Sequence, residues 1–185
     1  MNKTDRQYQS VLQECRDLFL KKNQDYGTAW RVLRPSSLTD QIYIKAGRIR
    51  SIDQKQNQKI VDSIEQEFIG IINYCIMALI QLDREKHEYT DPLNKENAPS
   101  LYNQYAQKVF SLMQSKNHDY DEAWRFMRVS SMTDLILMKL VRIKEIEDKK
   151  GNTLVSEGID ANYMDIMNYS IFALILLHES QNPNF

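Results

Sequence analysis

Two stretches of the chain carry the same amide, carboxylate, aromatic and cationic side chains in the same order. Residues 22–50 read KNQDYGTAWRVLRPSSLTDQIYIKAGRIR and residues 116–144 read KNHDYDEAWRFMRVSSMTDLILMKLVRIK, with 16 of 29 positions identical and no gap. A duplicated fold requires only that the apolar pattern be repeated, whereas here the polar and charged residues recur as well. The repeat therefore predicts a duplicated site and not duplicated packing alone.

Each copy begins with Lys-Asn-x-Asp-Tyr, where a first helix is expected to give way to a loop, and continues to Ala-Trp-Arg. Turn and cap contacts would account for the Asn and Asp. Aromatic rings, amides and a cation together suit a planar base, with a phosphate group nearby. We interpret both segments as ligand-binding loops. Their candidate residues are Lys22, Asn23, Asp25, Tyr26, Trp30 and Arg31 in the first copy, and Lys116, Asn117, Asp119, Tyr120, Trp124 and Arg125 in the second.

A second group of candidate residues is basic. Lys45 and Arg48 are three residues apart, as are Lys139 and Arg142, so each pair shares one helical face. Such residues usually form a solvated face, and carboxylates on the third helix of each copy are alternative partners through salt bridges. Because the basic positions are retained in both copies, we favour an anionic partner such as a polyphosphate.

A third group is acidic and lies near the end of each copy. In the second copy Glu157, Asp160 and Asp165 precede Asn168, and oxygen ligands without His or Cys suit Mg²⁺ or Mn²⁺. Acids near a helix N-terminus are also favoured by the helix dipole with no metal present. The first copy offers Glu65 and Glu67, has Gly70 where the second has Asp165, and has Asn73 in the place of Asn168. The two predicted sites are therefore unequal.

Length and composition bound the class of protein. Each copy spans roughly 85 residues, a size at which a lone core is marginal, so we expect the two copies to share one core. The net charge of −1 provides no global field for nucleic acid or an anionic membrane, although a local basic patch stays open. Cys15 and Cys75 lie in apolar helical patterns and are expected to be buried thiols. Without a signal-peptide core or a membrane-spanning run, we expect a cytoplasmic protein.

The apolar spacing predicts three helices in each copy and no strand. We expect an all-α helical bundle of two tandem three-helix units packed as a pseudo-dimer. The predicted division is a first unit at 1–86, a linker at 87–99, a second unit at 100–180 and a frayed tail at 181–185. Thr4 or Asp5 is the predicted N-cap of the first helix, which is expected to end near Lys22. Ser37 and Asp40 have the spacing of a capping box.

The motif KNxDYGxAWRxxRxSSxTDxIxxK, followed by xNYxIxAL in a long helix, resembles the nucleotide-modification-associated domain family of bacteria and phages. That family is grouped with the all-α NTP pyrophosphatases, the MazG-like and dimeric dUTPase-like superfamily. The resemblance covers nearly the whole chain, twice. It implies a helical bundle of paired units, Mg²⁺ held by acidic residues on two helices, and cleavage of a nucleoside triphosphate to a monophosphate and pyrophosphate.

These observations lead us to expect a nucleotide-binding protein that acts as a Mg²⁺-dependent pyrophosphohydrolase. Glu157, Asp160 and Asp165 would be the catalytic and metal-binding set, and a first-copy site using Glu65 and Glu67 would bind without cleaving. The loops, Asn73 and Asn168 would hold the base, and the basic pairs would hold phosphates. A non-catalytic sensor module and a structural helical protein are the alternatives, and a homodimer is left open.

Overall fold

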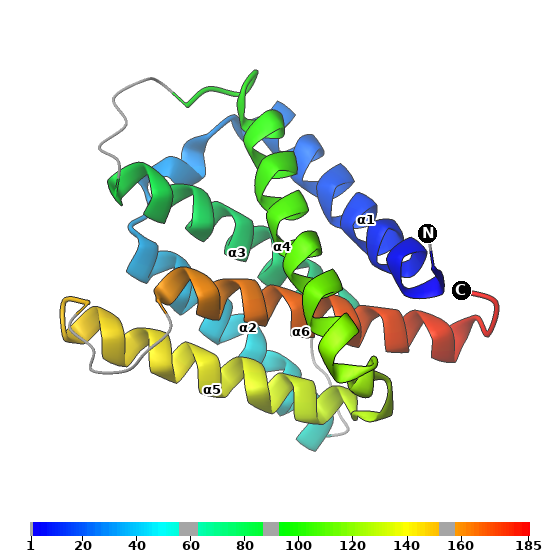
Figure 1. Ribbon diagram of the computed structural model, residues 1–185. Coiled ribbons are helices and arrows are strands. Elements are labelled where there is room, and N and C mark those ends of the chain that lie inside the picture. The colour runs from blue at the N-terminus through cyan, green and yellow to red at the C-terminus, as the bar shows by residue number, and fades with distance from the viewer. Residues whose placement is uncertain (1, 56–62, 87–92, 152–157) are drawn as a thin grey trace.

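The described residues form six long α-helices, which confirms the expected all-α class (Figure 1). The computed structural model describes residues 2–55, 63–86, 93–151 and 158–185, and these contain no strand. A short 3₁₀ helix follows the first helix of each unit, η1 (Ala29–Val32) and η2 (Ala123–Phe126). The long helices are α1 (Lys3–Tyr26), α2 (Pro35–Lys55), α3 (Ile64–Lys86), α4 (Ala98–Tyr120), α5 (Val129–Asp148) and α6 (Ile159–Gln181).

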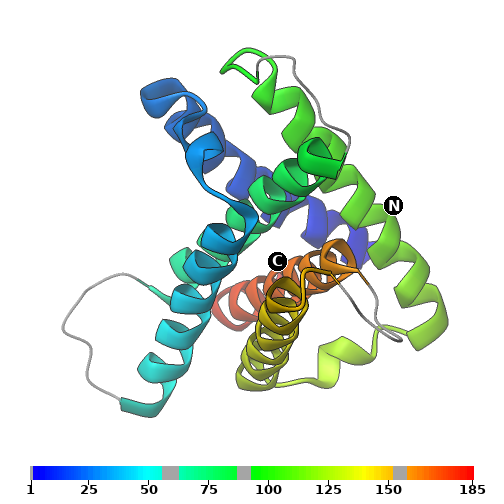
Figure 2. The same ribbon diagram turned by 90° about the vertical axis from the view of Figure 1, so that its left-hand side faces the viewer.

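The helices form three layers of two, each layer taking one helix from each unit. The third helices, α3 and α6, pack against each other in the middle layer, between α1 with α4 on one side and α2 with α5 on the other. Both views show this order (Figures 1 and 2). Because α6 is covered from both sides, its buried residues run almost continuously from Asn162 to Ile175 instead of forming one stripe. The two units share one core, as expected.

A pseudo-twofold relation between the units is visible in the ion pairs between α2 and α5. Asp40 accepts from Lys144 at 2.6 Å, and Asp134, which stands 94 positions after Asp40, accepts from Arg50 at 2.9 Å. Lys144 in turn stands 94 positions after Arg50. Such reciprocal contacts are the signature of a twofold interface, here formed within one chain.

Several predicted helix ends are corrected by the structure. The N-cap of α1 is Asn2, whose side chain accepts from the backbone N–H of Asp5 at 2.7 Å, and not Thr4 or Asp5. The helix also continues to Tyr26, so Lys-Asn-x-Asp-Tyr forms its last turn and not a loop. Since α2 already begins at Pro35, Ser37 lies inside the helix and cannot cap it.

The last residue of the chain contacts α1 and α6. The carbonyl of Phe185 accepts from Gln7 at 3.0 Å, and its ring meets that of His178 edge-on at 4.9 Å. The helix α4 begins at Ala98, within the predicted linker. Cys15 and Cys75 are buried free thiols, as expected, and burial raises the pKa of both. No helix in the described ranges combines the length and apolar character needed to cross a membrane.

Candidate functional site

A cavity of about 900 Å³ lies in the first unit, between the last turns of α1, the η1 segment, α2 and α3. This volume falls in the range typical of small-molecule sites. Candidate residues from three separate segments of sequence line it. They are Lys22, Asn23, Tyr26 and Trp30 from the end of α1 and η1, Lys45 from α2, and Glu67 and Asn73 from α3.

The rim of the cavity is formed by the end of α1. Tyr26 is 71% exposed and Lys22 is also exposed, while the Trp30 ring is partly buried. The helix is stopped by Gly27, whose backbone N–H donates to the carbonyl of Asn23 at 2.9 Å and whose φ is +58°. At this φ and a ψ of −138°, a side chain would be strained. The glycine therefore turns the chain sharply from Tyr26 to the η1 segment that carries Trp30.

Asn23 joins the cavity to the segment that precedes α4. Its amide nitrogen donates to the backbone carbonyl of Lys95 at 2.7 Å, which fixes the orientation of the side chain. The amide oxygen of Asn23 is buried and has no hydrogen-bond partner among the described residues. An unsatisfied buried acceptor is unfavourable and calls for an explanation.

The carboxylate of Glu67 is a buried charge of the first unit. It accepts from Lys45 at 3.0 Å and also from Arg48, and its side chain is only 5% exposed. These are the salt bridges to the third helix that the sequence offered as the alternative to an anionic ligand. Lys45 nevertheless lines the cavity beside Glu67, so the same side chain borders the cavity and pairs with the buried carboxylate.

In the second unit, the carboxylate that pairs with lysines lies about one helical turn later on the third helix than Glu67 does in the first. Asp165 accepts from Lys139 at 2.6 Å and from Lys116. Asn162, the counterpart of Glu67, donates instead to the carbonyl of Gly158 in its own helix at 3.0 Å. The buried carboxylate has thus moved from the position of Glu67 to that of Gly70 between the units.

The two tryptophans also differ in their surroundings. Trp124 is buried and stacks on Phe172, with ring centroids 4.2 Å apart and planes 4° from parallel. The counterpart of Phe172 is Met77, which lines the first-unit cavity together with Trp30. A phenyl ring therefore packs on the tryptophan in the second unit where a flexible thioether borders open space in the first.

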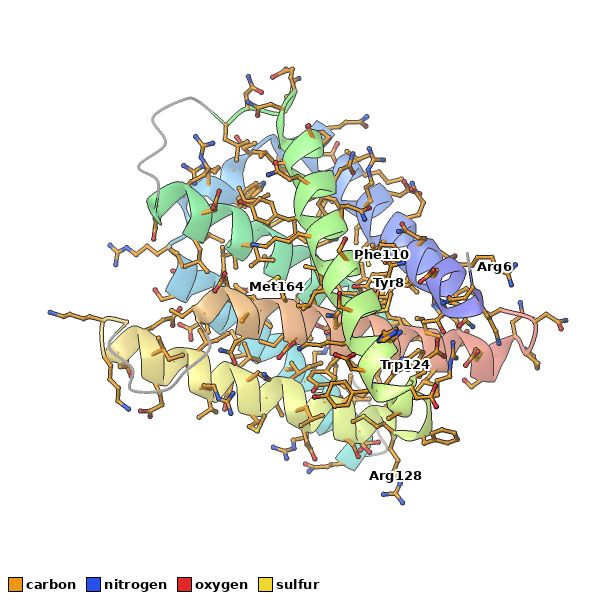
Figure 3. All side chains as sticks on the ribbon, in the orientation of Figure 1. Arg6, Tyr8, Phe110, Trp124, Arg128 and Met164 are labelled. Carbon is orange, nitrogen blue, oxygen red and sulfur yellow. The ribbon has the colours of Figure 1, made fainter. Side chains whose placement is uncertain are left out.

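The Asn73 and Asn168 amides hold the units together. Tyr8 on α1 donates to Asn168 on α6 at 2.6 Å, and Tyr102 on α4 donates to Asn73 on α3 at 2.9 Å. Asn73 also donates to the carbonyl of Cys15 at 3.0 Å. Tyr8 packs beside the Phe110 ring between α1 and α4 (Figure 3).

The basic residues outside the cavity are held in different ways. Arg125 lies over the Trp124 ring and donates to Glu122 at 2.6 Å, to Gln7 at 2.8 Å and to Thr4, which ties η2 to α1. Arg142 is exposed on α5. Arg31 borders a smaller cavity with Arg34 and Arg84. Arg128, the counterpart of Arg34, extends away from the helices (Figure 3).

The remaining loop candidates do not line the cavity. Asp25, Asp119 and Tyr120 are exposed, and Asn117 donates to the sulfur of Met113 at 2.9 Å. The second loop also turns differently, since Asp121 and Glu122 both have positive φ where the first loop has only Gly27.

The residues expected to bind Mg²⁺ do not gather at one place. Glu157 lies outside the described residues, and Asp160 is exposed beside Gly158. Glu65 accepts from Gln181 at 2.8 Å. Burial raises the pKa of Glu65, but hydrogen bonds from its own backbone N–H, Ser63 and Gln181 bring it below the ordinary value. In the described part of the chain, no three His, Cys, Asp or Glu residues are placed to hold a metal together. The described candidates therefore do not fit a shared metal centre.

Two carboxylates that sequence reasoning missed line the cavity, Glu14 and Asp17. They stand at i and i+3 on α1 and so share one face of that helix. The corresponding residues of the second unit are Lys108 and Ser111. Because these positions lie outside the repeated stretch and differ between units, comparing the copies gave no signal for them. Only the packing of α1 beside α3 reveals their place.

Comparison with known proteins agrees with the repeat. The family model described as "Nucleotide modification associated domain 1" matches residues 22–82 and again residues 116–177. No curated protein and no solved structure gave a significant match. The two matched segments together span more than half of the chain, and each includes one Lys-Asn-x-Asp-Tyr turn and one Asn-Tyr helix. The chain therefore belongs to the nucleotide modification associated domain 1 family and carries two tandem copies of this domain.

Proposed function

We propose that this protein binds a nucleotide in the cavity of its first unit. The observation that carries the proposal is that seven residues selected from the repeat converge on one cavity of about 900 Å³ from α1, η1, α2 and α3. Helix packing alone does not require two aromatic rings, two amides and two lysines to line one cavity.

The lining of the cavity suits the base and the phosphate of a nucleotide. Tyr26 and Trp30 offer aromatic faces on which a base can stack. Asn23 lines the same cavity and carries an amide, a group that can hydrogen-bond the edge of a base. Lys22 and Lys45 carry the positive charge that a phosphate group requires. The description of the family model supports the same class of ligand.

The two units are expected to contribute unequally, with one ligand bound per chain. In the second unit Asp165 joins Lys116 to Lys139, and Phe172 covers Trp124. These contacts engage the counterparts of the residues that face open space in the first unit. The second unit then serves chiefly to complete the shared core.

Hydrolysis of the bound nucleotide to a monophosphate and pyrophosphate is a second candidate function. It is favoured by Glu14 and Asp17, which add two carboxylates to the lining of the cavity. A carboxylate near a bound phosphate can position a water molecule for attack. The Mg²⁺ dependence implied by the family resemblance stays a prediction.

Tryptophan fluorescence provides the test of binding, because the chain has one tryptophan in each unit. In a Trp124→Phe variant Trp30 is the sole reporter and lines the cavity. Titration with ribo- and deoxyribonucleoside triphosphates should give a saturable change in Trp30 emission for at least one base. The matched Trp30→Phe variant, which reports from Trp124, should show little change.

The same nucleotides should raise the melting temperature of the unsubstituted protein. If neither the fluorescence nor the melting temperature responds to any nucleotide at millimolar concentration, the proposed function is wrong. Turnover is tested separately by measuring pyrophosphate release with and without Mg²⁺ or Mn²⁺. Binding without release under any metal would retain the binding function and reject hydrolysis.

A further inference from the structure

In the second unit, two lysines bind the carboxylate of the protein's own Asp165. Asp165 projects from α6 and its carboxylate is bound by Lys139 of α5 and by Lys116 from the last turns of α4. The Asp165 and Lys139 side chains are each 9% exposed, whereas Lys116 is 45% exposed and reaches in from the surface. Two lysines from different helices thus surround one buried negative group.

The first unit has the same two lysines but no carboxylate at the position of Asp165, and its buried carboxylate, Glu67, lies three residues earlier on α3. Lys22 and Lys45 stand 94 positions before Lys116 and Lys139, and Gly70 takes the place of Asp165. All three residues line the cavity. No ion pair of Lys22 is found among the residues that the structure describes. The first unit therefore retains the two lysines, and they border a cavity.

Lys45 already lies over Gly70. A β-carbon added to Gly70 would meet the Cε of Lys45 at 2.7 Å and its Cδ at 2.9 Å. The absence of a side chain thus lets the flexible end of Lys45 pass across the helix and reach Glu67 at 3.0 Å. Glu67 also accepts from Arg48, and Lys45 has three N–H donors, so Lys45 can bind a second anion while Glu67 stays paired.

We infer that the anionic group of the ligand binds over Gly70, between Lys22 and Lys45, where the carboxylate of Asp165 lies in the second unit. This subsite deepens the nucleotide-binding function proposed above and rests on it for the identity of the whole ligand. The group that fits is a phosphate or pyrophosphate moiety, because two lysines from separate helices can share its several oxygens. Asp165 is then the internal counterpart of that group.

The test places a carboxylate between the two lysines of the first unit, as in the second unit. A Gly70→Asp variant places a carboxylate beside Lys45, in the manner of Asp165 beside Lys139, and the flexible Lys45 side chain can move to accept it. Lys22→Ala removes an exposed cation and is not expected to affect folding. Lys116→Ala is the matched control in the second unit. Each is titrated with the nucleoside triphosphates, the corresponding nucleosides and inorganic pyrophosphate.

We expect Gly70→Asp and Lys22→Ala to weaken triphosphate binding by about ten- to a hundredfold, the effect of losing a charge-assisted hydrogen bond. Nucleoside binding should stay unchanged in both variants, and Lys116→Ala should bind as the unsubstituted protein does. Unchanged triphosphate affinity in both Gly70→Asp and Lys22→Ala would overturn the subsite while leaving nucleotide binding intact. An equal loss of nucleoside affinity would also overturn it, because the effect would then not concern the anion.

Inorganic pyrophosphate separates the subsite from the proposed function. If no nucleotide or nucleoside binds, but pyrophosphate raises the melting temperature of the unsubstituted protein and not of Gly70→Asp, the anion site stands and nucleotide binding fails. If pyrophosphate stabilises both proteins equally, the anion binds elsewhere and the inference is wrong.

Discussion

The phenolic hydroxyl of Tyr8 on the first helix donates a hydrogen bond of 2.6 Å to the amide oxygen of Asn168 on the last helix. Tyr102 repeats the contact with Asn73 at 2.9 Å. Each unit therefore sends its first helix onto the third helix of the other unit. Both tyrosines are buried, and burial raises the pKa of each. This exchange makes the two copies one folding unit and holds α1 against the cavity.

Removing either hydroxyl should destabilise the whole protein. Tyr8→Phe and Tyr102→Phe each leave a buried amide oxygen without its donor, so we expect the free energy of unfolding to fall by about 1–3 kcal/mol. Urea denaturation measures the change. Tyr120→Phe is the control, because Tyr120 is 71% exposed and should have no effect. Unchanged stability in both buried variants would contradict the assigned hydrogen bonds.

The buried ion pair of the second unit should be far more sensitive to substitution at Lys139 than at Lys116. Lys139→Met leaves the Asp165 carboxylate without its buried partner and should lower the free energy of unfolding by roughly 3 kcal/mol. Lys116→Met removes a half-exposed partner and should cost under about 1 kcal/mol. Equal losses in the two variants, measured by chemical denaturation, would show that both lysines contribute alike.

The turn at Gly27 should tolerate no side chain, in contrast to a helical glycine. Gly27→Ala forces an alanine into a positive-φ conformation and should destabilise the protein by about 1–3 kcal/mol. Gly47→Ala lies inside α2, where a β-carbon meets nothing within 4 Å, and should stabilise it by up to about 1 kcal/mol. Thermal melts of the two variants should move in opposite directions. A shift of the same sign in both would reject the strained turn.

Glu147 on α5 should destabilise the fold as pH rises. Burial raises its pKa above the ordinary value, although the hydrogen bond from Thr39, at 2.8 Å, partly offsets this. The folded state therefore favours the protonated acid, and its contribution is present below the unfolded pKa of about 4.3 and lost as the pH rises through the folded value. Glu147→Gln should raise the melting temperature at pH 7.

The gain from Glu147→Gln should shrink as the pH is lowered toward 4, where Glu147 itself becomes neutral. Melting curves of both proteins between pH 4 and pH 8 measure this difference. A gain for Glu147→Gln that does not vary with pH would contradict the raised pKa.

The sequence by itself determined the class of fold and seven of the residues that line the cavity. Helical periodicity is local, so the apolar pattern was sufficient to predict an all-α chain without its packing partners. The repeat added Lys22, Asn23, Tyr26 and Trp30, because polar residues retained in both copies are constrained by more than packing. Helix ends were less well predicted, since Asn2 and Gly27 act through backbone hydrogen bonds and φ values that spacing does not reveal.

Only the tertiary structure revealed the cavity of the first unit. The sequence directed attention to Asp165 as a metal ligand in the second unit, whereas in the fold this carboxylate pairs with Lys116 and Lys139. The cavity lies instead beside Gly70 and Met77 and includes Glu14 and Asp17 from α1. The contacts of Asp165, Gly70 and Lys45 are made with groups far away in sequence. Their distance and burial are set by how three layers of helices from two units pack, which no local pattern encodes.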